Sequence, residues 1–297
     1  MAKISIIGSG FVGFEVGKDL VYLGNEVIFH DVSNTRLAEL AKNGYKTTND
    51  LRVAISNSDI SFIVVPTPTI DDKFDTSFIE SVSKEIGEHL KSKTSYHLIV
   101  VKSTVLPGTT EGIIIPLLEK NSGKMAGTDF GVCMNPEFLT QIHNSWNDEN
   151  SFKRNFSSDE RIVIGELDKR SGDMLEDLYA SFKIPTFRMK IKEVEFLKYT
   201  ANCALAARIS YWNQIFLAGK QIGISDDCIR RIAEIVGMDS RIGKYGTVLG
   251  KAFGGKCLPK DLQALSNFLE EKGFEPELLK VVGNINKHMA KNYGVRE

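Results

Sequence analysis

Cysteine and histidine are scarce in this sequence, with 4 Cys and 5 His among 297 residues. The cysteines stand far apart, form no C-x-x-C pair and have no clustered histidines beside them; they are Cys133, Cys203, Cys228 and Cys257. This spacing argues against a zinc site and against a disulfide framework. We therefore expect no metal, reduced thiols and a cytoplasmic location.

Long apolar runs and a charge bias are also absent. No segment approaches about eighteen consecutive apolar residues, so a membrane span is not expected. The amino-terminal segment M-A-K-I-S-I-I-G-S-G lacks the longer apolar region and the cleavage site of a signal peptide. The net charge is −1 and acids and bases are interspersed, which gives no basic face for nucleic acid. We expect neither a nucleic acid nor a membrane as partner.

The composition that remains is that of an ordinary globular protein, with 42% hydrophobic and 25% charged residues. Its first half alternates short β-branched runs with amphipathic stretches, which is typical of a doubly wound α/β sheet, parallel and covered by helices on both faces. The predicted strands are Ile4–Ile7, Val27–Phe29, Ile60–Val65, Leu98–Val101, Gly131–Met134 and Ile162–Ile164. The predicted helices are Val12–Leu23, Thr35–Lys42, Thr76–Leu90, Thr110–Lys120 and Gly172–Phe182.

The pattern changes after Pro185. From Ile191 to about Ala218 the sequence has neither Gly nor Pro and apolar residues recur at helical spacing, which predicts one long helix. Further helices are expected at Asp226–Val236, Pro259–Glu271 and Pro276–Ala290. We place a domain boundary near residue 190, giving a cofactor-binding domain over 1–190 and an all-helical central domain over 191–297.

A long connection interrupts the first domain between two predicted strands. The segment Thr140–Asp159 is polar, contains scattered aromatics and has no clear period. Such connections are longer than usual and serve either as lids or as disordered segments. The sequence leaves both interpretations open.

A glycine-rich turn follows the first predicted strand directly. Gly8, Gly10 and Gly13 form G-S-G-F-V-G, with Phe11 and Val12 at the mouth of a helix. Gly8 allows a tight turn, Gly10 allows the backbone to approach a pyrophosphate, and Gly13 allows the helix to lie close to the strand. The helix amino terminus then offers N–H groups to phosphates. The alternative is three ordinary turn glycines.

An acidic residue ends the second predicted strand. A carboxylate at Asp31 is placed to accept hydrogen bonds from the 2′-hydroxyl of an adenosine ribose and to repel a 2′-phosphate, which favours NAD over NADP. The alternative is an Asp that only starts a turn, as this residue commonly does. The nearby Arg36 also weakens the preference for NAD over NADP. Strand, glycines, helix and acid together predict an NAD site that includes Arg36.

Five further motifs occur in a specific order: V-P-T-P, K-S-T-V-L-P-G-T, N-P-E-F-L, L-K-Y-T-A-N and F-G-G-K-C-L-P-K-D, beginning at residues 65, 102, 135, 197 and 253. In order and spacing they resemble the UDP-glucose/GDP-mannose dehydrogenase family, over essentially the whole chain. The resemblance implies an NAD-dependent oxidation of a nucleotide-sugar C6 alcohol to a carboxylate, with two hydride transfers. It also implies that Pro66, Thr67 and Thr104 line the cofactor site, with Thr104 beside the reacting carbon.

Cys257 is the candidate nucleophile that the resemblance implies, holding the intermediate as a thiohemiacetal and then a thioester. Its neighbours suit that role, since Gly254 and Gly255 allow close approach and Pro259 suits a first helical turn. Lys256 and Lys260 add positive charge that favours a thiolate. The alternative is a small core cysteine before a helix, which remains our interpretation of the other three cysteines.

Lys198 and Asn202 are four residues apart on the long predicted helix, so their side chains share a face. The resemblance implies that they stabilise oxyanionic character at C6. The alternative is a solvated Lys198 paired with Glu195 one turn earlier. The motif match favours the functional role.

Glu137 and Asp261 match the family's acid/base and water-handling carboxylates. Further substrate-binding residues that the resemblance implies are Phe138, Leu139, Arg241, Tyr245 and Gly254. Arg241 lies in D-S-R-I-G and matches an arginine that reaches the substrate of a neighbouring subunit. This implies a homodimer formed through the long helix.

Two departures from the family pattern affect the interpretation. Gln141 follows N-P-E-F-L where relatives usually carry a carboxylate, and an amide cannot act as a base. Relatives also carry a third, C-terminal domain that holds much of the nucleotide, whereas this chain stops at Tyr293–Glu297. A naturally short enzyme, a partner that supplies the missing wall and a truncated reading frame all remain open.

The first substrate we expect is UDP-glucose, giving UDP-glucuronate. GDP-mannose is the alternative, because G-E-L-D-K-R-S-G-D at Gly165–Asp173 resembles the mannose branch. Two other functions remain open: a non-catalytic NAD-binding subunit that partners a full-length relative, and a two-electron alcohol dehydrogenase of similar architecture. The first is disfavoured by the joint presence of Cys257, Lys198, Asn202, Glu137 and Asp261. The second has Gln141 as its only support in the sequence, and Cys257 counts against it.

Overall fold

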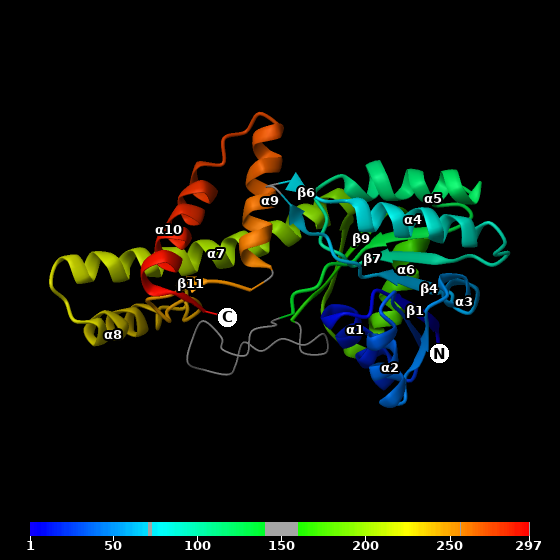
Figure 1. Ribbon diagram of the computed structural model, residues 1–297, viewed down its shortest axis with the longest axis horizontal. Helices are drawn as coiled ribbons and strands as arrows, with labels where there is room; N and C mark the ends of the chain where they lie inside the picture. Colours follow the sequence, from blue (N-terminus) through cyan, green and yellow to red (C-terminus); the bar gives the residue numbers. More distant parts are fainter. Residues whose placement is uncertain (71–72, 140–159, 256, 297) are drawn as a thin grey trace. The chain divides into compact units, whose positions relative to one another are not determined.

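The chain forms two compact units (Figure 1). The computed structural model describes residues 1–70, 73–139, 160–255 and 257–296. Within these ranges the first unit, which we name the sheet unit, holds residues 1–68, 74–139 and 160–198, and the second, the helical unit, holds most of the remainder from Tyr199 onward. The division between the units lies inside one long helix, after Lys198. Thr140–Asp159, with Gln141, lies outside the described residues.

An eight-stranded sheet forms the centre of the sheet unit, in the order β10-β9-β8-β7-β4-β1-β2-β3. Its strands are β1 (Lys3–Ile7), β2 (Glu26–His30), β3 (Lys46–Thr48), β4 (Ile60–Ile63), β7 (Leu98–Val101), β8 (Gly131–Met134), β9 (Ile162–Glu166) and β10 (Thr186–Lys190). The predicted doubly wound α/β fold is confirmed. The sheet is nevertheless mixed, because β9 pairs antiparallel with β8 and parallel with β10.

The helices of the sheet unit are α1 (Phe11–Tyr22), α2 (Asn34–Lys42), α3 (Leu51–Ser56), α4 (Ser77–Leu90), a π turn at Thr110–Ile114, α5 (Ile115–Ser122), α6 (Lys169–Tyr179) and a 3-10 turn at Ala180–Phe182. Side chains of Ser33, Asp50 and Asp168 accept backbone N–H groups at the starts of α2, α3 and α6. The helix predicted over Thr110–Lys120 is present, but its first turn is a π turn rather than an α-helical one. Pro116 has no N–H to donate one turn back, so the ladder widens there.

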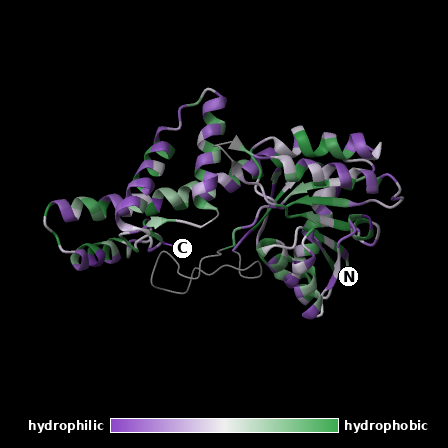
Figure 2. Ribbon diagram, in the orientation of Figure 1, coloured by the Kyte–Doolittle hydropathy of each residue, from purple (hydrophilic) through white to green (hydrophobic). Residues whose placement is uncertain are grey.

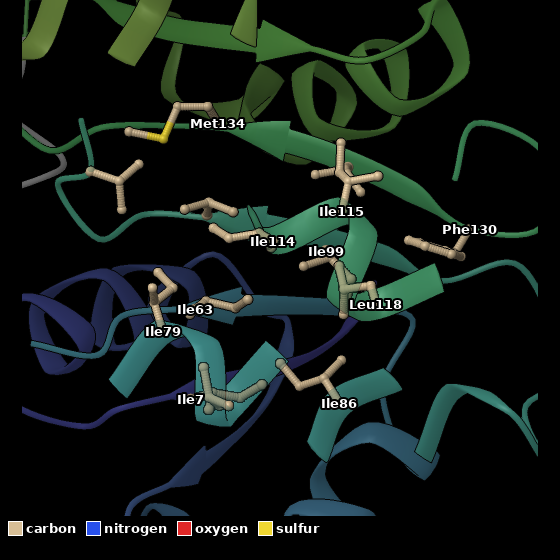
Figure 3. Packing of buried hydrophobic residues seen from close by; sticks show 14 of the residues in the cluster. Ile7, Ile63, Ile79, Ile86, Ile99, Ile114, Ile115, Leu118, Phe130 and Met134 are labelled. Carbon is tan, nitrogen blue, oxygen red and sulfur yellow. The ribbon is translucent and has the colours of Figure 1, made fainter. Parts of the chain in front are cut away.

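Two apolar clusters cover the two faces of the sheet, because successive strand residues point to opposite sides. On β1, Ile4 and Ile6 pack with α1, α2 and α6 on one face, whereas Ile7 packs with α3, α4 and α5 on the other. Figure 3 shows the second cluster, where strand residues such as Ile63 and Met134 meet helix residues such as Ile86. Figure 2 shows the central strands of this sheet as mainly hydrophobic. Helices on both faces leave the strand ends available for function.

A buried polar chain lies at the start of β7. The Nε2 of His97 lies 2.7 Å from the Ser61 hydroxyl, which lies 2.6 Å from the Ser5 hydroxyl. The His97 side chain is only 1% exposed. Burial, aided by the positive charge of Lys93, lowers the pKa of His97 from 6.5 to about 3. The imidazole is therefore neutral in the folded protein at neutral pH.

This buried imidazole predicts loss of stability in acid. The unfolded chain binds a proton at His97 below pH 6.5 and the folded chain only near pH 3, so the free energy of unfolding decreases as pH falls through this window. The expected slope is about 1.4 kcal/mol per pH unit. Urea unfolding of wild type and His97→Gln across the window measures the difference. Parallel pH profiles for the two proteins would contradict the assignment.

The helical unit contains α8 (Asp226–Val236), α9 (Leu258–Glu271), α10 (Glu277–Tyr293) and most of α7 (Ile191–Gln221), as expected from the apolar spacing after Pro185. Trp212 and Phe216 of α7 pack against Ile229 of α8 and Met289 of α10. The short strands β11 (Ala252–Phe253) and β12 (Val295–Arg296) pair in parallel, and β5 (Thr69–Ile70) pairs with β6 (Lys73–Phe74). Along the described ranges, no helix is long and apolar enough to cross a membrane.

Candidate functional site

The glycine turn between β1 and α1 has the geometry that the sequence predicts for a phosphate-binding turn. Gly8 has φ +96°, and a Cβ there would lie 2.5 Å from the Val64 carbonyl oxygen. A Cβ on Gly13 would collide with the Gly8 carbonyl oxygen, so helix and turn are in direct contact. A Cβ on Gly10, in contrast, would meet no atom of the described residues within 4 Å. The turn is closed on the protein side and open at Gly10.

The amino terminus of α1 is open as well. No side chain among the described residues caps it and no acidic residue lies in its first turn, while Phe11 is 43% exposed and Val12 is partly exposed. The first N–H groups of a helix have no partner within the helix and carry partial positive charge. The turn and helix therefore fit the diphosphate of a dinucleotide.

Asp31 and Arg36 are both held against this turn. The Oδ2 of Asp31 accepts a 2.7 Å hydrogen bond from the Ser9 N–H, and its Oδ1 accepts one of 2.9 Å from the Ser33 N–H. Arg36 donates from Nε to the Ser9 carbonyl oxygen at 2.8 Å. A carboxylate oxygen accepts more than one hydrogen bond, so Asp31 keeps capacity for ribose hydroxyls. The described residues thus fit NAD.

Removal of the Asp31 carboxylate should weaken NAD binding. Asp31→Ala loses the charged acceptor for the ribose, and we expect the NAD dissociation constant to rise about 10- to 100-fold. Titration calorimetry with NAD measures the change. Glu26→Ala, at the opposite end of the same strand, is the matched control. An unchanged constant for Asp31→Ala would remove Asp31 from the cofactor site.

The loops that follow β4 and β7 are joined at the same edge of the sheet. Thr67 donates from its hydroxyl to the Thr104 carbonyl oxygen at 2.7 Å, and Ser103 donates from its hydroxyl to the Val65 carbonyl oxygen at 2.7 Å. Thr67 is buried, whereas Pro66 is exposed. The structure therefore brings together Thr67 and Thr104, with Pro66 next to Thr67 in the chain, while their common role at the cofactor stays a prediction.

Glu195 at the start of α7 anchors the next part of that loop. Its carboxylate is fully buried and accepts backbone hydrogen bonds from Gly108 at 2.5 Å and Thr110 at 2.9 Å. Burial raises the pKa of Glu195. The alternative of a solvated Lys198 paired with Glu195 is wrong, because the Glu195 carboxylate serves this loop.

Lys198 instead forms a buried ion pair with Glu137. The two side chains are 3% and 9% exposed. Lys198 donates from Nζ to the Glu137 carbonyl oxygen at 2.5 Å and to its Oε1 at 3.2 Å. The Glu137 Oε2 accepts the Leu139 N–H at 2.6 Å, and the Phe138 ring lies 5.2 Å from the Lys198 ammonium. The segment Glu137–Leu139 is thereby fixed on α7.

In the helical unit, Asn202 is paired with Asp261. Asn202 donates from Nδ2 to Asp261 Oδ2 at 2.6 Å, and the Lys260 ammonium lies 2.6 Å from the other carboxylate oxygen. Asp261 is 1% exposed. Lys198 and Asn202 belong to the same helix, α7, four residues apart. One helix therefore presents an ammonium and an amide that are each bound to a buried carboxylate.

Cys257 lies directly before α9 and its side chain is exposed. Its carbonyl oxygen accepts the Asp261 N–H at 2.8 Å, and Pro259 occupies the first helical turn. Gly255 has φ +75°, and a Cβ on Gly254 would collide with Val295. Burial raises the pKa of the Cys203 thiol to about 12. Among these two thiols, Cys257 is the accessible one.

Arg241 and Tyr245 lie in the loop after α8. The Arg241 guanidinium is 87% exposed and binds Asp239, with 2.6 Å between Nη2 and Oδ2, and this pairing raises its pKa. Arg208 of α7 donates from Nη2 to the Gly243 carbonyl oxygen at 3.0 Å and so anchors the loop. Tyr245 is half-buried. The part of Arg241 and Tyr245 in substrate binding stays a prediction.

Sequence reasoning missed the residues that support the site. Lys102 and Asn135 lie inside two of the quoted motifs, and Glu195 lies one helical turn before Lys198, so a signal for these three residues was present. Arg208 and Tyr179 carry no such signal. The described residues contain no cluster of His, Cys, Asp or Glu able to hold a metal ion.

The sheet, the open glycine turn and Asp31 define a dinucleotide-binding oxidoreductase fold. Residues 38–183 match the NAD binding domain of the UDP-glucose/GDP-mannose dehydrogenase family, and residues 192–288 match the central domain of that family. The chain belongs to this family. The expected cofactor, NAD, agrees with the matched domain.

Several known proteins are similar to this chain. GDP-mannose 6-dehydrogenase of Pseudomonas aeruginosa is 38% identical in an alignment that covers 89% of this chain and 63% of that protein. UDP-glucose 6-dehydrogenase of Haloferax volcanii is 31% identical in an alignment that covers 96% of this chain and 69% of that protein. A UDP-glucose dehydrogenase structure from Pyrobaculum islandicum has TM-score 0.87 and 32% identity, covering 98% of this chain and 69% of that one. The chain thus spans about two thirds of the length of these relatives.

Proposed function

We propose that this chain carries out an NAD-dependent four-electron oxidation of a nucleotide-sugar C6 alcohol to a carboxylate. The observation that carries the proposal is the burial of charged groups on one helix and its partners. Lys198 is paired with Glu137, and Asn202 with Asp261, at exposures of 9% or less. Burying charges costs several kcal/mol even when they are paired. A purely structural fold has no need of these groups, whereas proton and oxyanion chemistry does.

The reaction proceeds in four steps. The C6 alcohol loses a proton and a hydride to give an aldehyde. The Cys257 thiolate adds to that aldehyde, and the resulting tetrahedral thiohemiacetal loses a second hydride to give a thioester. Water then adds to the thioester, which releases the carboxylate and restores the thiol. NAD, when bound, accepts one hydride in each oxidation, so two NAD and one water are consumed per sugar.

Residues of the chain stabilise negative charge and accept protons in these steps. Lys198 and Asn202 are donors that stabilise negative charge on the C6 oxygen in each tetrahedral state. Glu137 and Asp261 accept the protons released from the alcohol and from the attacking water. Thr104 lies on the loop that faces the cofactor, and Phe138, Leu139, Gly254, Arg241 and Tyr245 contribute to sugar and nucleotide binding.

Two substrates remain candidates within this reaction. UDP-glucose was the first expectation from sequence, and the higher identity to GDP-mannose 6-dehydrogenase, 38% against 31%, supports GDP-mannose. The test is NADH formation by the purified chain with NAD and each nucleotide sugar. We expect turnover with one of the two. NAD binding without turnover for either would support a non-catalytic subunit and contradict the proposal.

We also propose a homodimer through α7. Exposed apolar side chains on α7 and the neighbouring α8 support it, since Tyr211 is 57% exposed and Ile235 is 58% exposed. Covering such residues by a second copy removes apolar area from water. Sedimentation equilibrium should give a dimer at micromolar concentration, and Ile235→Glu should weaken it at least about tenfold. A monomeric wild type would contradict the dimer.

We also propose that the chain consists of a cofactor-binding domain over 1–190 and a helical domain over 191–297, and that the protein is cytoplasmic. The two matched family domains, over 38–183 and 192–288, support a division between them. Raised pKa values of the buried thiols Cys133 and Cys203 support their being reduced and inert.

A further inference from the structure

The backbone that carries Glu137 is held by a buried polar network outside the residues assigned above. Lys102, directly after β7, donates from Nζ to Asn135 Oδ1 at 2.7 Å and to the Asn135 carbonyl oxygen at 3.2 Å. The same ammonium lies 3.4 Å from the Pro136 carbonyl oxygen. Lys102 thus binds the two residues that precede Glu137.

Asn135 is fixed from two further directions. Tyr179, the last residue of α6, donates from its hydroxyl to Asn135 Oδ1 at 2.7 Å. Asn135 in turn donates from Nδ2 to the Val163 carbonyl oxygen in β9 at 2.8 Å. Its own N–H donates to the Val101 carbonyl oxygen at 2.9 Å. Side chains from a loop and a helix therefore hold the amide of Asn135 between two strands.

The side chains of this network are closed off from the protein surface, which makes their geometry strict. Lys102, Asn135 and Tyr179 are each 1% exposed. Water has little access to replace any of these hydrogen bonds, and an unsatisfied buried polar group is costly. Pro136, with its fixed φ, leaves little freedom between Asn135 and Glu137. The position of the Glu137 backbone therefore follows from the position of Asn135.

Glu137 meets Lys198 through its backbone as well as its side chain. The shortest contact of the pair joins the Lys198 ammonium to the Glu137 carbonyl oxygen, at 2.5 Å. A rotation of the peptide planes at Asn135 and Pro136 would move this oxygen and the carboxylate together. The ion pair therefore depends on the network beneath it.

We propose that Lys102, together with Tyr179 and acting through Asn135, is a positioning residue that sets Glu137 against Lys198 for the oxidation proposed above. This inference rests on that proposed function for its catalytic consequence, but its structural part concerns Asn135–Leu139 alone. Lys102 and Tyr179 touch neither substrate nor cofactor in this role.

Hydrogen exchange of the full chain without ligand tests the structural part. The Asn135 and Leu139 N–H groups are bonded to Val101 and to the Glu137 carboxylate, so their protection reports on the segment. In Lys102→Met we expect them to exchange at least about tenfold faster than in wild type. In Tyr179→Phe, which removes one hydroxyl, we expect the exchange rate of these groups to increase about threefold or more.

Matched controls separate positioning from general loss of a buried polar group. Lys93 donates from Nζ to the backbone carbonyl oxygens of Ile55 and Ser58, and Tyr96 bonds Ser171 through its hydroxyl. Lys93→Met and Tyr96→Phe should leave exchange at Asn135 and Leu139 within about twofold of wild type. The proposal is overturned if these two N–H groups exchange at the wild-type rate in Tyr179→Phe and, provided that this variant folds, in Lys102→Met.

Kinetics test the catalytic part. Lys102→Met should lower kcat about 10- to 100-fold, because a small displacement of an acid/base group has this cost, while the KM for NAD stays within about twofold. Lys93→Met should keep the wild-type kcat. A wild-type kcat in both Lys102→Met and Tyr179→Phe overturns the proposal. An inactive wild type would instead refute the proposed function, and hydrogen exchange would still decide whether Lys102 positions Glu137.

Discussion

The Cys257→Ser variant should form no sugar acid. A serine hydroxyl is a far weaker nucleophile than a thiolate at neutral pH, so the aldehyde is not captured and the second hydride transfer has no tetrahedral adduct to act on. We expect the rate of acid formation to fall at least about 10³-fold, while NAD affinity stays within about twofold. Acid formation is measured by chromatography of the reaction products.

Cys228→Ser is the matched control for this experiment. Cys228 is exposed like Cys257, and it lies in α8 with no neighbouring glycine or lysine of the quoted motif. Its substitution should leave acid formation unchanged. Acid production by Cys257→Ser at the wild-type rate would show that the thioester route assigned to this residue is wrong.

The Lys198→Met variant should show the second large effect, on both stability and rate. Glu137 would keep a buried carboxylate with its ammonium partner removed, and loss of one partner of a buried pair costs about 3 to 5 kcal/mol. The oxyanion would also lose a charged donor, so kcat should fall about 10²- to 10³-fold. Urea unfolding and NADH formation measure the two effects.

A double variant separates the effect on stability from the effect on rate. Lys198→Met combined with Glu137→Gln no longer buries an unpaired charge, so most of the lost stability should return, whereas activity should not. Lys192→Met, at an exposed position of the same helix, is the control and should change neither quantity. A fully active Lys198→Met enzyme would exclude Lys198 from the chemistry.

Much of the fold could be predicted because its central strands are short apolar runs between amphipathic helices. The edge strands β3 and β10 were not predicted, because they lack such apolar runs. In β10 most of Thr186–Lys190 is exposed or half-exposed, and β3 has only Lys46–Thr48, so neither has the apolar signal of a buried strand. The antiparallel direction of β9 was also missed, because an apolar run reads the same for either direction.

The predicted strand Ile60–Val65 is shorter in the structure, ending at Ile63. Val64 and Val65 continue the apolar run but lead into Pro66, which cannot donate to a strand ladder. The chain leaves the sheet there and forms the loop that Thr67 joins to Thr104. Apolar character alone did not mark this end.

The sequence motifs singled out candidate site residues one by one, but they did not predict how those residues pair. Helical spacing placed Glu195 beside Lys198, yet Glu195 binds the loop at Gly108 and Lys198 binds Glu137, which is distant in sequence. Local spacing reveals neighbours on a helix surface and nothing of the loops that pack on it. The role of Lys102 was hidden for the same reason, since its partner Asn135 lies in another motif.

The most direct test of the proposed four-electron oxidation is the number of NADH molecules formed for each nucleotide sugar consumed by the purified chain. We expect two, with the sugar acid as product, because the thioester step requires a second hydride transfer before water releases the acid. One NADH per sugar, with an aldehyde as product, would contradict it and identify a two-electron alcohol dehydrogenase.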